Sequence, residues 1–425
     1  MIKFEVKSNQ KLKVFICAYA CLQDPDKRFG NGGEGVLGWN IVKQLARFHQ
    51  VFVLTHSENK LEIEKALEKE PVQNIKFYYL DLPFFNFLQK FSGGIQIYAY
   101  LWQIKAYFLA RKLHSKYHFD VFHHVTYAND WMTSFIGALL KTPYIRGPGG
   151  GAHRTPKRFL REYSLWGRLW EHLRAIGQWV FRHDPFFILG QQRARAILVC
   201  NPEALKAIPK KWQDKAHLFP VNGISSRDLS LNEPAERDDE KFRILSAGKL
   251  IRLRGFFLAI KAFKLFVDEH PDAELKIVGD GPDRPYLKNL ICQLQFQSQV
   301  QLHPWMPREE LLAKMNSCDV FLFPSLRDGG GAVVVEAMAA GKPTICLDIG
   351  GPGMHVTNNC GIKITPHSPE QAVAEMARAL ERLYSDKKLR LEMGKEARAR
   401  AEQVYHWDRL GERLREIYEQ VLRLP

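Results

Sequence analysis

Short apolar runs alternate with longer stretches of helical periodicity along the chain. In the first half these runs are KVFICAY, QVFVLT, IKFYYL, DVFHHV, the weaker TPYIRG, and AILVC. Helical patterns separate them, for example at Val36–Phe48 and Asn59–Lys69. Apolar runs of strand length between helices are typical of a parallel sheet buried on both faces. The pattern predicts an α/β fold with doubly wound sheets.

The alternation stops in the polar, turn-rich segment 221–241 and then restarts. Five further runs of strand length follow: FRILSAG, AELKIVG, QVQLHPW, CDVFLFP and PTICLDI. Helices are expected at Phe256–Glu269, at Arg284–Gln295 and from Ala332 onwards. We therefore predict an N-terminal domain over 1–220, a linker over 221–241, a C-terminal domain over 242–405 and a final helix over 406–425.

The net charge of +15 is concentrated in the first half of the chain. Residues 1–220 contain 32 Lys and Arg against 17 Asp and Glu, whereas residues 221–425 contain 29 of each. A uniformly basic chain that coats nucleic acid would not show this asymmetry, and no nucleic-acid-binding motif accompanies the charge. The asymmetry indicates two domains with different partners.

Cysteine usage and hydropathy point to a cytoplasmic protein. The seven cysteines are scattered and form no paired C-x-x-C motif, which argues against a disulfide framework and a zinc ribbon. No 18-residue apolar run is present, and the first residues lack the apolar region of a secretory signal.

The segment FLFPSLRDGGGAVVVEAMAAGKP holds the most informative chemistry. An apolar strand ends at Pro324, and a loop then carries Asp328, Gly329, Gly330 and Gly331. A helix follows with Glu336 in its first turns. Glycines let a phosphate approach the backbone, and the helix N-terminus offers N–H groups to an anion. A tight strand-to-helix turn is the structural alternative.

A second segment, ILSAGKLIRLRGFF, carries Gly248, Lys249 and Arg254 before a helix. Two cations at a helix opening would favour a bound anion such as a diphosphate. A solvated basic turn is the alternative. Two weaker features follow later strands: the turn with Gly281 and the loop with Met306, which a Gly-Pro turn and a buried Trp305 explain equally well.

The segment with Asp328 and Glu336 resembles the family-four glycosyltransferases of the GT-B fold, whose signature is an acid, seven residues and then Glu with Ala-Met-Ala. The resemblance implies two Rossmann-like domains facing across a cleft, with the C-terminal helix packing back on the N-terminal domain. It also implies that the first acid lies near the transferred sugar and that Glu336 holds the nucleotide ribose. This chain has Asp328 where the family has Glu, so the role of that acid is open. Gly281 and Met306 would lie near the nucleotide.

The first half is similar to a subgroup of these enzymes with a Gly-Ser-Glu and a Gly-Pro-x-Gly-Gly-like pattern. The glycine-rich loop Phe29–Trp39 offers Gly32, Gly33 and Glu34 as cleft residues, and the IRGPGGGAH segment offers Gly149 and Gly150. His123 and His153 are candidate catalytic residues, with hydrogen-bonded structural histidines as the alternative.

A basic, Trp-rich stretch at 157–182 is the strongest feature of the excess charge. Trp166, Leu169, Trp170, Leu173 and Val180 fall near one helical face. This pattern is typical of an interfacial helix on anionic lipid, but also of a helix that packs its apolar face on its own domain. An acidic or lipid-linked acceptor would use the same charge.

The sequence predicts a glycosyltransferase that moves a sugar from a nucleotide-diphosphate donor to a hydroxyl acceptor, and the family resemblance implies that the anomeric configuration is retained. No metal site and no cofactor are expected, since Lys249, Arg254 and helix ends supply positive charge. A nucleotide-sugar epimerase of the same fold and a non-catalytic, membrane-associated binding protein are the rival interpretations.

Overall fold

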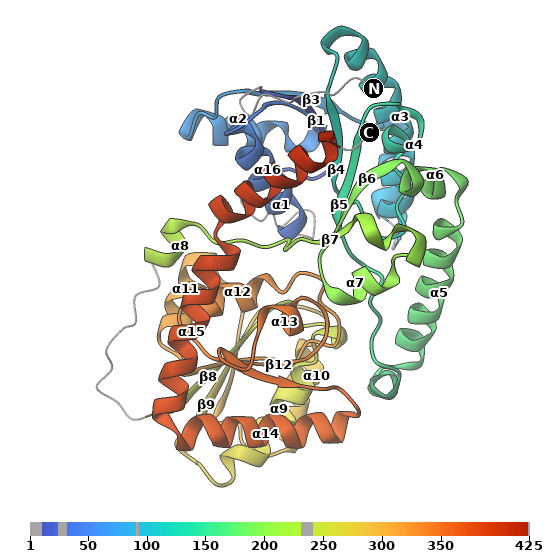
Figure 1. Ribbon diagram of the computed structural model, residues 1–425. Coiled ribbons are helices and arrows are strands. Elements are labelled where there is room, and N and C mark those ends of the chain that lie inside the picture. Colours follow the sequence, from blue (N-terminus) through green and yellow to red (C-terminus); the bar gives the residue numbers. More distant parts are fainter. Residues whose placement is uncertain (1–10, 24–31, 91–92, 231–240, 424–425) are drawn as a thin grey trace. The chain divides into compact units, whose positions relative to one another are not determined.

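The computed structural model describes residues 11–23, 32–90, 93–230 and 241–423, and the chain divides into two compact units (Figure 1). The first unit comprises Met1–Ala152, His172–Val221 and Trp407–Pro425, and the second comprises His153–Glu171 and Asn222–His406. Residues 231–240 of the expected linker lie outside the described residues.

The described part of the first unit is built on a seven-stranded parallel sheet in the order β3-β2-β1-β4-β5-β6-β7. The strand order reverses between β1 and β4, which makes the ends of these strands a topological switch point. The strands are β1 (Lys13–Ala18), β2 (Gln50–His56), β3 (Ile75–Leu80), β4 (Val121–Thr126), β5 (Tyr144–Gly149), β6 (Ala194–Val199) and β7 (Ala216–Leu218).

Both faces of this sheet are covered, because alternate residues of each buried strand point to opposite sides. Val14 and Ile16 of β1 enter a core with α1 and α16, whereas Phe15 and Cys17 enter a core with α3. The helices in these residues are α1 (Gly32–Ala46), α2 (Lys60–Lys69), α3 (Gly94–Tyr117), α4 (Phe135–Leu139), α5 (Leu165–Arg182, which begins in the second unit), α6 (Pro185–Arg193), α7 (Pro202–Ala207) and α16 (Trp407–Arg423).

The C-terminal helix α16 buries the predicted apolar stripe against the first unit. Leu410, Leu414 and Ile417 share a core with Val14 of β1 and with Leu45 of α1. The expectation that the last helix packs on the N-terminal domain is confirmed. Because alternating strands and helices form parallel sheets in both units, the doubly wound α/β fold is confirmed as well.

The second unit holds six described strands in the order β10-β9-β8-β11-β12-β13, all parallel. They are β8 (Arg243–Ala247), β9 (Glu274–Val278), β10 (Val300–His303), β11 (Val320–Phe323), β12 (Thr344–Leu347) and β13 (Gly361–Ile364). The order reverses between β8 and β11. The helices are α8 (Ser226–Ser230), α9 (Phe256–Val267), α10 (Arg284–Gln293), α11 (Arg308–Asn316), α12 (Ala332–Ala339), α13 (Gly350–His355), α14 (Pro369–Ser385) and α15 (Lys387–Tyr405).

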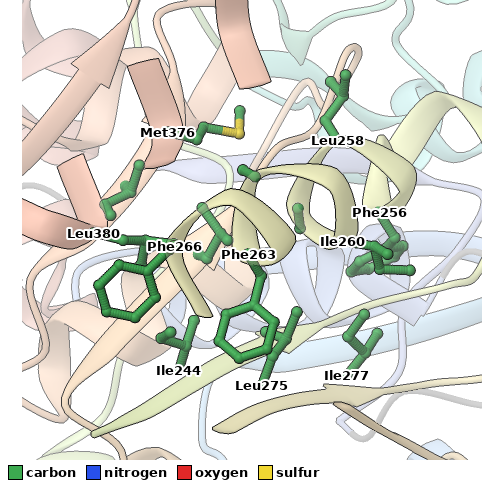
Figure 2. Close-up of a cluster of buried hydrophobic side chains, with 14 of the residues drawn as sticks. Ile244, Phe256, Leu258, Ile260, Phe263, Phe266, Leu275, Ile277, Met376 and Leu380 are labelled. Atoms are coloured by element: carbon green, nitrogen blue, oxygen red, sulfur yellow. The ribbon is translucent and has the colours of Figure 1, made fainter. Parts of the chain in front are cut away.

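Helix α9 packs on one face of this sheet. Figure 2 shows Phe263 and Phe266 of α9 pointing toward Ile244 and Leu275 of the strands. Met376 of α14 joins the same cluster, and all of these side chains are buried. Burying each large apolar side chain contributes roughly 1.5–3 kcal/mol. This core fixes the start of α9, and therefore the loop that precedes it.

Two expectations differ from the structure. The glycine-rich loop expected at Phe29–Trp39 is helical from Gly32, and residues 29–31 lie outside the described residues. Glu34 in the first turn accepts a hydrogen bond from the N–H of Tyr127. This bond ties the first turn of α1 to the residue after β4, and an acidic side chain there also favours the helix N-terminus. The expected N-terminal domain ran unbroken to residue 220, whereas His153–Glu171 groups with the second unit because Phe159 and Tyr163 enter its core.

Candidate active site

Two loops meet at the switch point of the second sheet. The loop after β8 carries Arg254 and the loop after β11 carries Ser325 and Asp328. The N–H of Leu326 donates to the carbonyl of Leu253 at 2.9 Å, and Arg254 Nη1 donates to Ser325 Oγ at 3.4 Å. Arg254 also forms an ion pair with Asp328. Ligands of doubly wound sheets bind at such a point, so the predicted residues of both loops are brought together where a ligand is expected.

Asp328 uses both of its carboxylate oxygens within the protein. Oδ2 pairs with Arg254, and Oδ1 accepts the N–H groups of Gly330 and Gly331 at 3.1 and 2.9 Å. The carboxylate therefore closes the turn of the glycine loop that leads into α12, whose N-cap is Gly331. The N–H groups of Gly330 and Gly331, which the sequence offered to a phosphate, thus already donate to a carboxylate of the chain.

The loop with Gly248 and Lys249 lies on the turn after β9. The N–H of Gly248 donates to Val278 at 3.0 Å, and the N–H of Leu250 donates to Asp280 at 2.9 Å. Gly279 and Gly281 have φ of 148° and 158°, and a Cβ on Gly279 would lie 2.0 Å from the carbonyl oxygen of Gly248. Glycine is required here because two backbones touch. The side chain of Lys249 is exposed at the edge of this arrangement.

The two weaker sequence features are also brought together. Asp280 Oδ2 accepts the N–H of Trp305 at 2.8 Å, so the turn after β9 holds the loop after β10. Trp305 is 52% exposed, so the alternative of a buried structural tryptophan is wrong. Met306, beside it, packs partly on the core that includes Val334 and Met338 of α12.

Glu336 lies on α12 in an ion pair that the sequence did not reveal. Arg308, at the start of α11, donates Nε to Glu336 Oε1 at 2.7 Å and Nη1 to Asp228 of α8. Burial raises the pKa of the Glu336 carboxyl, and Arg308 opposes this rise. Burial also acts to raise the pKa of Asp228, but hydrogen bonds from Arg308 and Ser225 hold it below its ordinary value. A lone Arg and a distant Asp carry no spacing signal that could have identified them.

His355 is a second functional candidate that the sequence analysis missed. It is fully buried on α13, with Nδ1 3.0 Å from Tyr405 Oη and Nε2 against the carbonyl oxygen of Gly330. Burial lowers its pKa to about 4. A neutral His355 therefore supports the Gly329–Gly331 loop from behind.

In the first unit, Glu34 lies at the switch point of its own sheet. Its carboxylate accepts the N–H of Tyr127, just after β4, at 3.0 Å, and burial raises its pKa. Gly32 and Gly33 begin the same helix, and Gly33 is exposed. These three predicted residues therefore share one helix N-terminus.

Gly149 and Gly150 lie at the end of β5 in close packing. A Cβ on Gly149 would lie 2.3 Å from the carbonyl oxygen of Ala128, and one on Gly150 would lie 2.5 Å from Cys200 Sγ. Gly149 O accepts the N–H of Cys200, and Gly150 O accepts the N–H of Asp130. Tight packing accounts for both glycines without a ligand.

His123 occupies an interior, structural environment. Its Nδ1 lies 2.7 Å from Tyr418 Oη and its Nε2 lies 2.6 Å from the carbonyl oxygen of Gly147, and burial lowers its pKa to about 4. With both ring nitrogens engaged, His123 has no atom to offer a substrate, which favours the structural alternative. His153 is half-buried and begins the segment that groups with the second unit.

Both loops lie within a segment that resembles a known protein family. Residues 230–400 match the model of the family "Glycosyl transferases group 1". These residues include both loops and Glu336. The matches support a glycosyltransferase of the GT-B fold.

Two curated relatives are glycosyltransferases. An uncharacterized glycosyltransferase of Methanocaldococcus jannaschii is 28% identical over 320 residues, covering 71% of this chain and 75% of the relative. The D-inositol 3-phosphate glycosyltransferase of an Arthrobacter species is 33% identical over 174 residues, covering 40% of each chain. The chain thus matches less than half the length of the inositol enzyme.

A solved structure shows the same fold. Anabaena HepE, crystallised in complex with UDP, superimposes with a TM-score of 0.60 at 15% identity, covering 97% of this chain and 100% of HepE. The two Rossmann-like, parallel-sheet units match the GT-B fold of solved glycosyltransferase structures.

Proposed function

We propose that the protein is a retaining glycosyltransferase that moves a sugar from a nucleotide-diphosphate donor to a hydroxyl acceptor without a metal ion. One observation carries the proposal: the loops with Lys249 and Arg254 and with Asp328 meet at the switch point of the second sheet. The family match covers the same residues, and a structural neighbour was solved with UDP. The Gly-Ser-Glu-like subgroup is part of this proposal.

In the proposed complex, Lys249 and Arg254 neutralise the diphosphate. Arg254 lies directly before α9, whose N-terminus adds a favourable field for an anion. Glu336 holds the ribose, and the loop with Trp305 and Met306 lies beside the base. Arg308 already holds the Glu336 carboxylate in place before the nucleotide sugar binds. The ribose hydroxyls would therefore donate their hydrogen bonds to a carboxylate whose position is fixed.

The proposed reaction occurs on one face of the sugar. The bond between the anomeric carbon and the diphosphate oxygen breaks, and a bond to the acceptor oxygen forms. The acceptor proton passes to the leaving diphosphate. Arg254 and Lys249 stabilise the negative charge that develops on the leaving group. Asp328 would act by holding Arg254 and the glycine loop before α12, which is consistent with its engaged oxygens.

The proposal assigns the acceptor to the first unit. Gly32, Gly33 and Glu34 at the start of α1 are its candidate contacts. An acidic or lipid-linked hydroxyl acceptor, and an anionic membrane surface at 157–182, match the excess of cations in this half of the chain.

A candidate cation cluster does not lie at these loops. Glu269, His270 and Glu381 offer atoms within 4.8 Å of one another. They lie beyond the C-terminal end of α9 and on α14, whereas the proposed site is at the N-terminal end of α9. With about 1.5 Å of rise per residue, the helix separates the two by roughly 18 Å.

A panel of nucleotide sugars, screened by thermal shift and then by product formation, tests the proposal. With the donor that stabilises the chain, Lys249→Ala should lower kcat about 100-fold or more, as expected for removing a charge that stabilises the leaving group. Glu336→Gln should raise KM for the donor. Lys388→Ala, on an 87% exposed side chain of α15, is the matched control and should change neither value.

Four outcomes would contradict the proposal. Unchanged turnover in both Lys249→Ala and Glu336→Gln would refute the site assignment. Conversion of the nucleotide sugar without an acceptor would favour an epimerase. Tight donor binding with no turnover across sugars and acceptors would favour a non-catalytic binding protein. Activity that is abolished by a chelator and restored by a divalent cation would refute metal independence.

A further inference from the structure

Helix α5 contacts the rest of the protein through its polar side. Arg174 Nη2 and Gln178 Nε2 both donate to the carbonyl oxygen of Gly151 at 2.9 Å, and Arg182 Nε donates to that of Asp130 at 3.3 Å. Glu171, one turn earlier, forms an ion pair with Arg327. These residues recur at steps of three and four and therefore form one stripe along the helix. Gln178 is the buried residue of α5.

The opposite side of α5 is apolar and exposed. Eight large apolar side chains on this helix are between 47% and 81% exposed: Leu165, Trp166, Leu169, Trp170, Leu173, Ile176, Trp179 and Val180. In Figure 1, α5 is the green helix at the right margin. The alternative that this helix packs its apolar face on its own domain is wrong. Its amphipathicity is inverted relative to α16, which buries Leu410, Leu414 and Ile417.

Such a surface indicates a partner that covers it. Single exposed apolar residues are common on proteins, but a continuous apolar helical face is typical of an interaction site. Trp166 and Trp170, one turn apart on this side of the helix, suit the boundary between water and acyl chains, because an indole has an apolar body and one N–H donor. Among the described residues, no helix is long and apolar enough to cross a membrane.

Charge identifies the kind of partner. Residues 157–182 contain six Lys and Arg and two acids. Both acids are engaged within the protein: Glu171 with Arg327, and Glu162 with Lys261 at 3.6 Å. Lys157 and Arg158, which precede the helix, are exposed. A Trp-rich apolar face beside exposed cations is complementary to a bilayer that contains anionic lipid.

We propose that α5 is a membrane-docking helix that lies in the plane of an anionic bilayer surface, with its exposed apolar face in the headgroup and acyl boundary. Its polar stripe stays on the protein. This proposal does not depend on the reaction assigned above, because it rests on the exposure and the anchoring of α5 alone.

Vesicle co-sedimentation of the full chain tests the proposal. The protein should bind vesicles of equal parts phosphatidylcholine and phosphatidylglycerol, and bind phosphatidylcholine alone more weakly. The double variant Trp166→Ser/Trp179→Ser should bind about tenfold or more weakly, since each loses apolar area that would otherwise be buried. The matched control Leu61→Ser/Leu391→Ser removes apolar side chains that are 58% and 55% exposed on α2 and α15, and should bind as the unmodified chain does.

Two more measurements separate the outcomes. Lys157→Gln/Arg158→Gln should reduce the preference for anionic vesicles while leaving the tryptophans in place. Light scattering without lipid reports the oligomeric state. Equal vesicle binding by the tryptophan variant and its control would overturn the proposal. A second result would also overturn it: the unmodified protein does not bind vesicles but forms a dimer, and the tryptophan variant is monomeric. In that case a second copy of the chain would cover the apolar face.

Discussion

Arg308 should be the residue on which the candidate donor site depends most for stability. It joins α8, α11 and α12 through Asp228 and Glu336, whose side chains are only 10% and 17% exposed. In Arg308→Gln, two largely buried carboxylates would face each other without a cation. Breaking a buried ion pair costs roughly 3–5 kcal/mol, and the 38% exposure of Arg308 lowers our expectation to about 2–4 kcal/mol.

A neighbouring pair supplies the control. Arg227 and Glu309 also join α8 to α11, but their side chains are 70% and 67% exposed, so Arg227→Gln should cost less than about 1 kcal/mol. For a unit of this size, about 2–4 kcal/mol corresponds to a fall in Tm of roughly 5–15 °C. Thermal unfolding by circular dichroism measures this fall, and hydrogen exchange of peptides from β8 and β11 assigns it to the second unit.

The pH dependence of the stability of Arg308→Gln is a second test. The pKa of Glu336 is already raised by burial, so without Arg308 this group should accept a proton more readily. A protonated carboxyl needs no cation, and the deficit of Arg308→Gln should therefore shrink as the pH falls. Equal destabilisation by Arg308→Gln and Arg227→Gln, or a deficit that grows in acid, would refute the reasoning.

Three further predictions concern the scaffold. The pKa of His123 is lowered from about 6.5 to about 4, so the unfolded chain takes up a proton first as the pH falls, and up to about 3 kcal/mol of stability should be lost by pH 4. His123→Gln should flatten this loss in acid melts, and the exposed His367→Gln should not. Gly279→Ala should lower stability by about 2 kcal/mol or more and weaken donor binding by calorimetry, whereas Gly177→Ala, whose Cβ would meet no described atom within 4 Å, should be neutral or stabilising. Ser368→Ala removes the capping box of α14 and should cost about 1 kcal/mol in urea unfolding.

The strands of both sheets could be predicted because a parallel sheet buried on both faces requires continuous apolar runs. Every run of that kind became a strand. The sequence did not reveal β7 (AHL) or β13 (GIKI), because three or four residues carry too little pattern. Helices were expected between the runs, but the pattern set no bounds for α3. Trp102 and Ala106 are buried, while Ile97 and Phe108 are exposed, so apolar residues surround this helix and no single face stands out.

The candidate site was predictable only where its residues are close in sequence. Asp328 and Glu336 follow from one strand-loop-helix segment, and Arg254 follows from another. Their partners do not: Arg308 lies 28 residues from Glu336, and Asp228 lies 80 residues from Arg308. A hydrogen bond between distant segments leaves no periodicity in either segment. The engagement of Asp328 with the Gly330 and Gly331 N–H groups was hidden for a related reason, since spacing cannot tell whether the N–H groups of a glycine loop bind a ligand or a carboxylate of the same loop.

Helix α5 shows a different limit of sequence patterns. A period of 3.6 residues divides a helix into an apolar and a polar face, but it does not state which face meets the protein. Here the carbonyl groups of Gly151 and Asp130 need donors, and Arg174, Gln178 and Arg182 supply them. A helix satisfies those carbonyls only by turning its polar stripe inward. The exposed tryptophans are thus a consequence of how the loop after β5 is held, and a substitution such as Gln178→Leu should loosen that loop without making the apolar face turn inward.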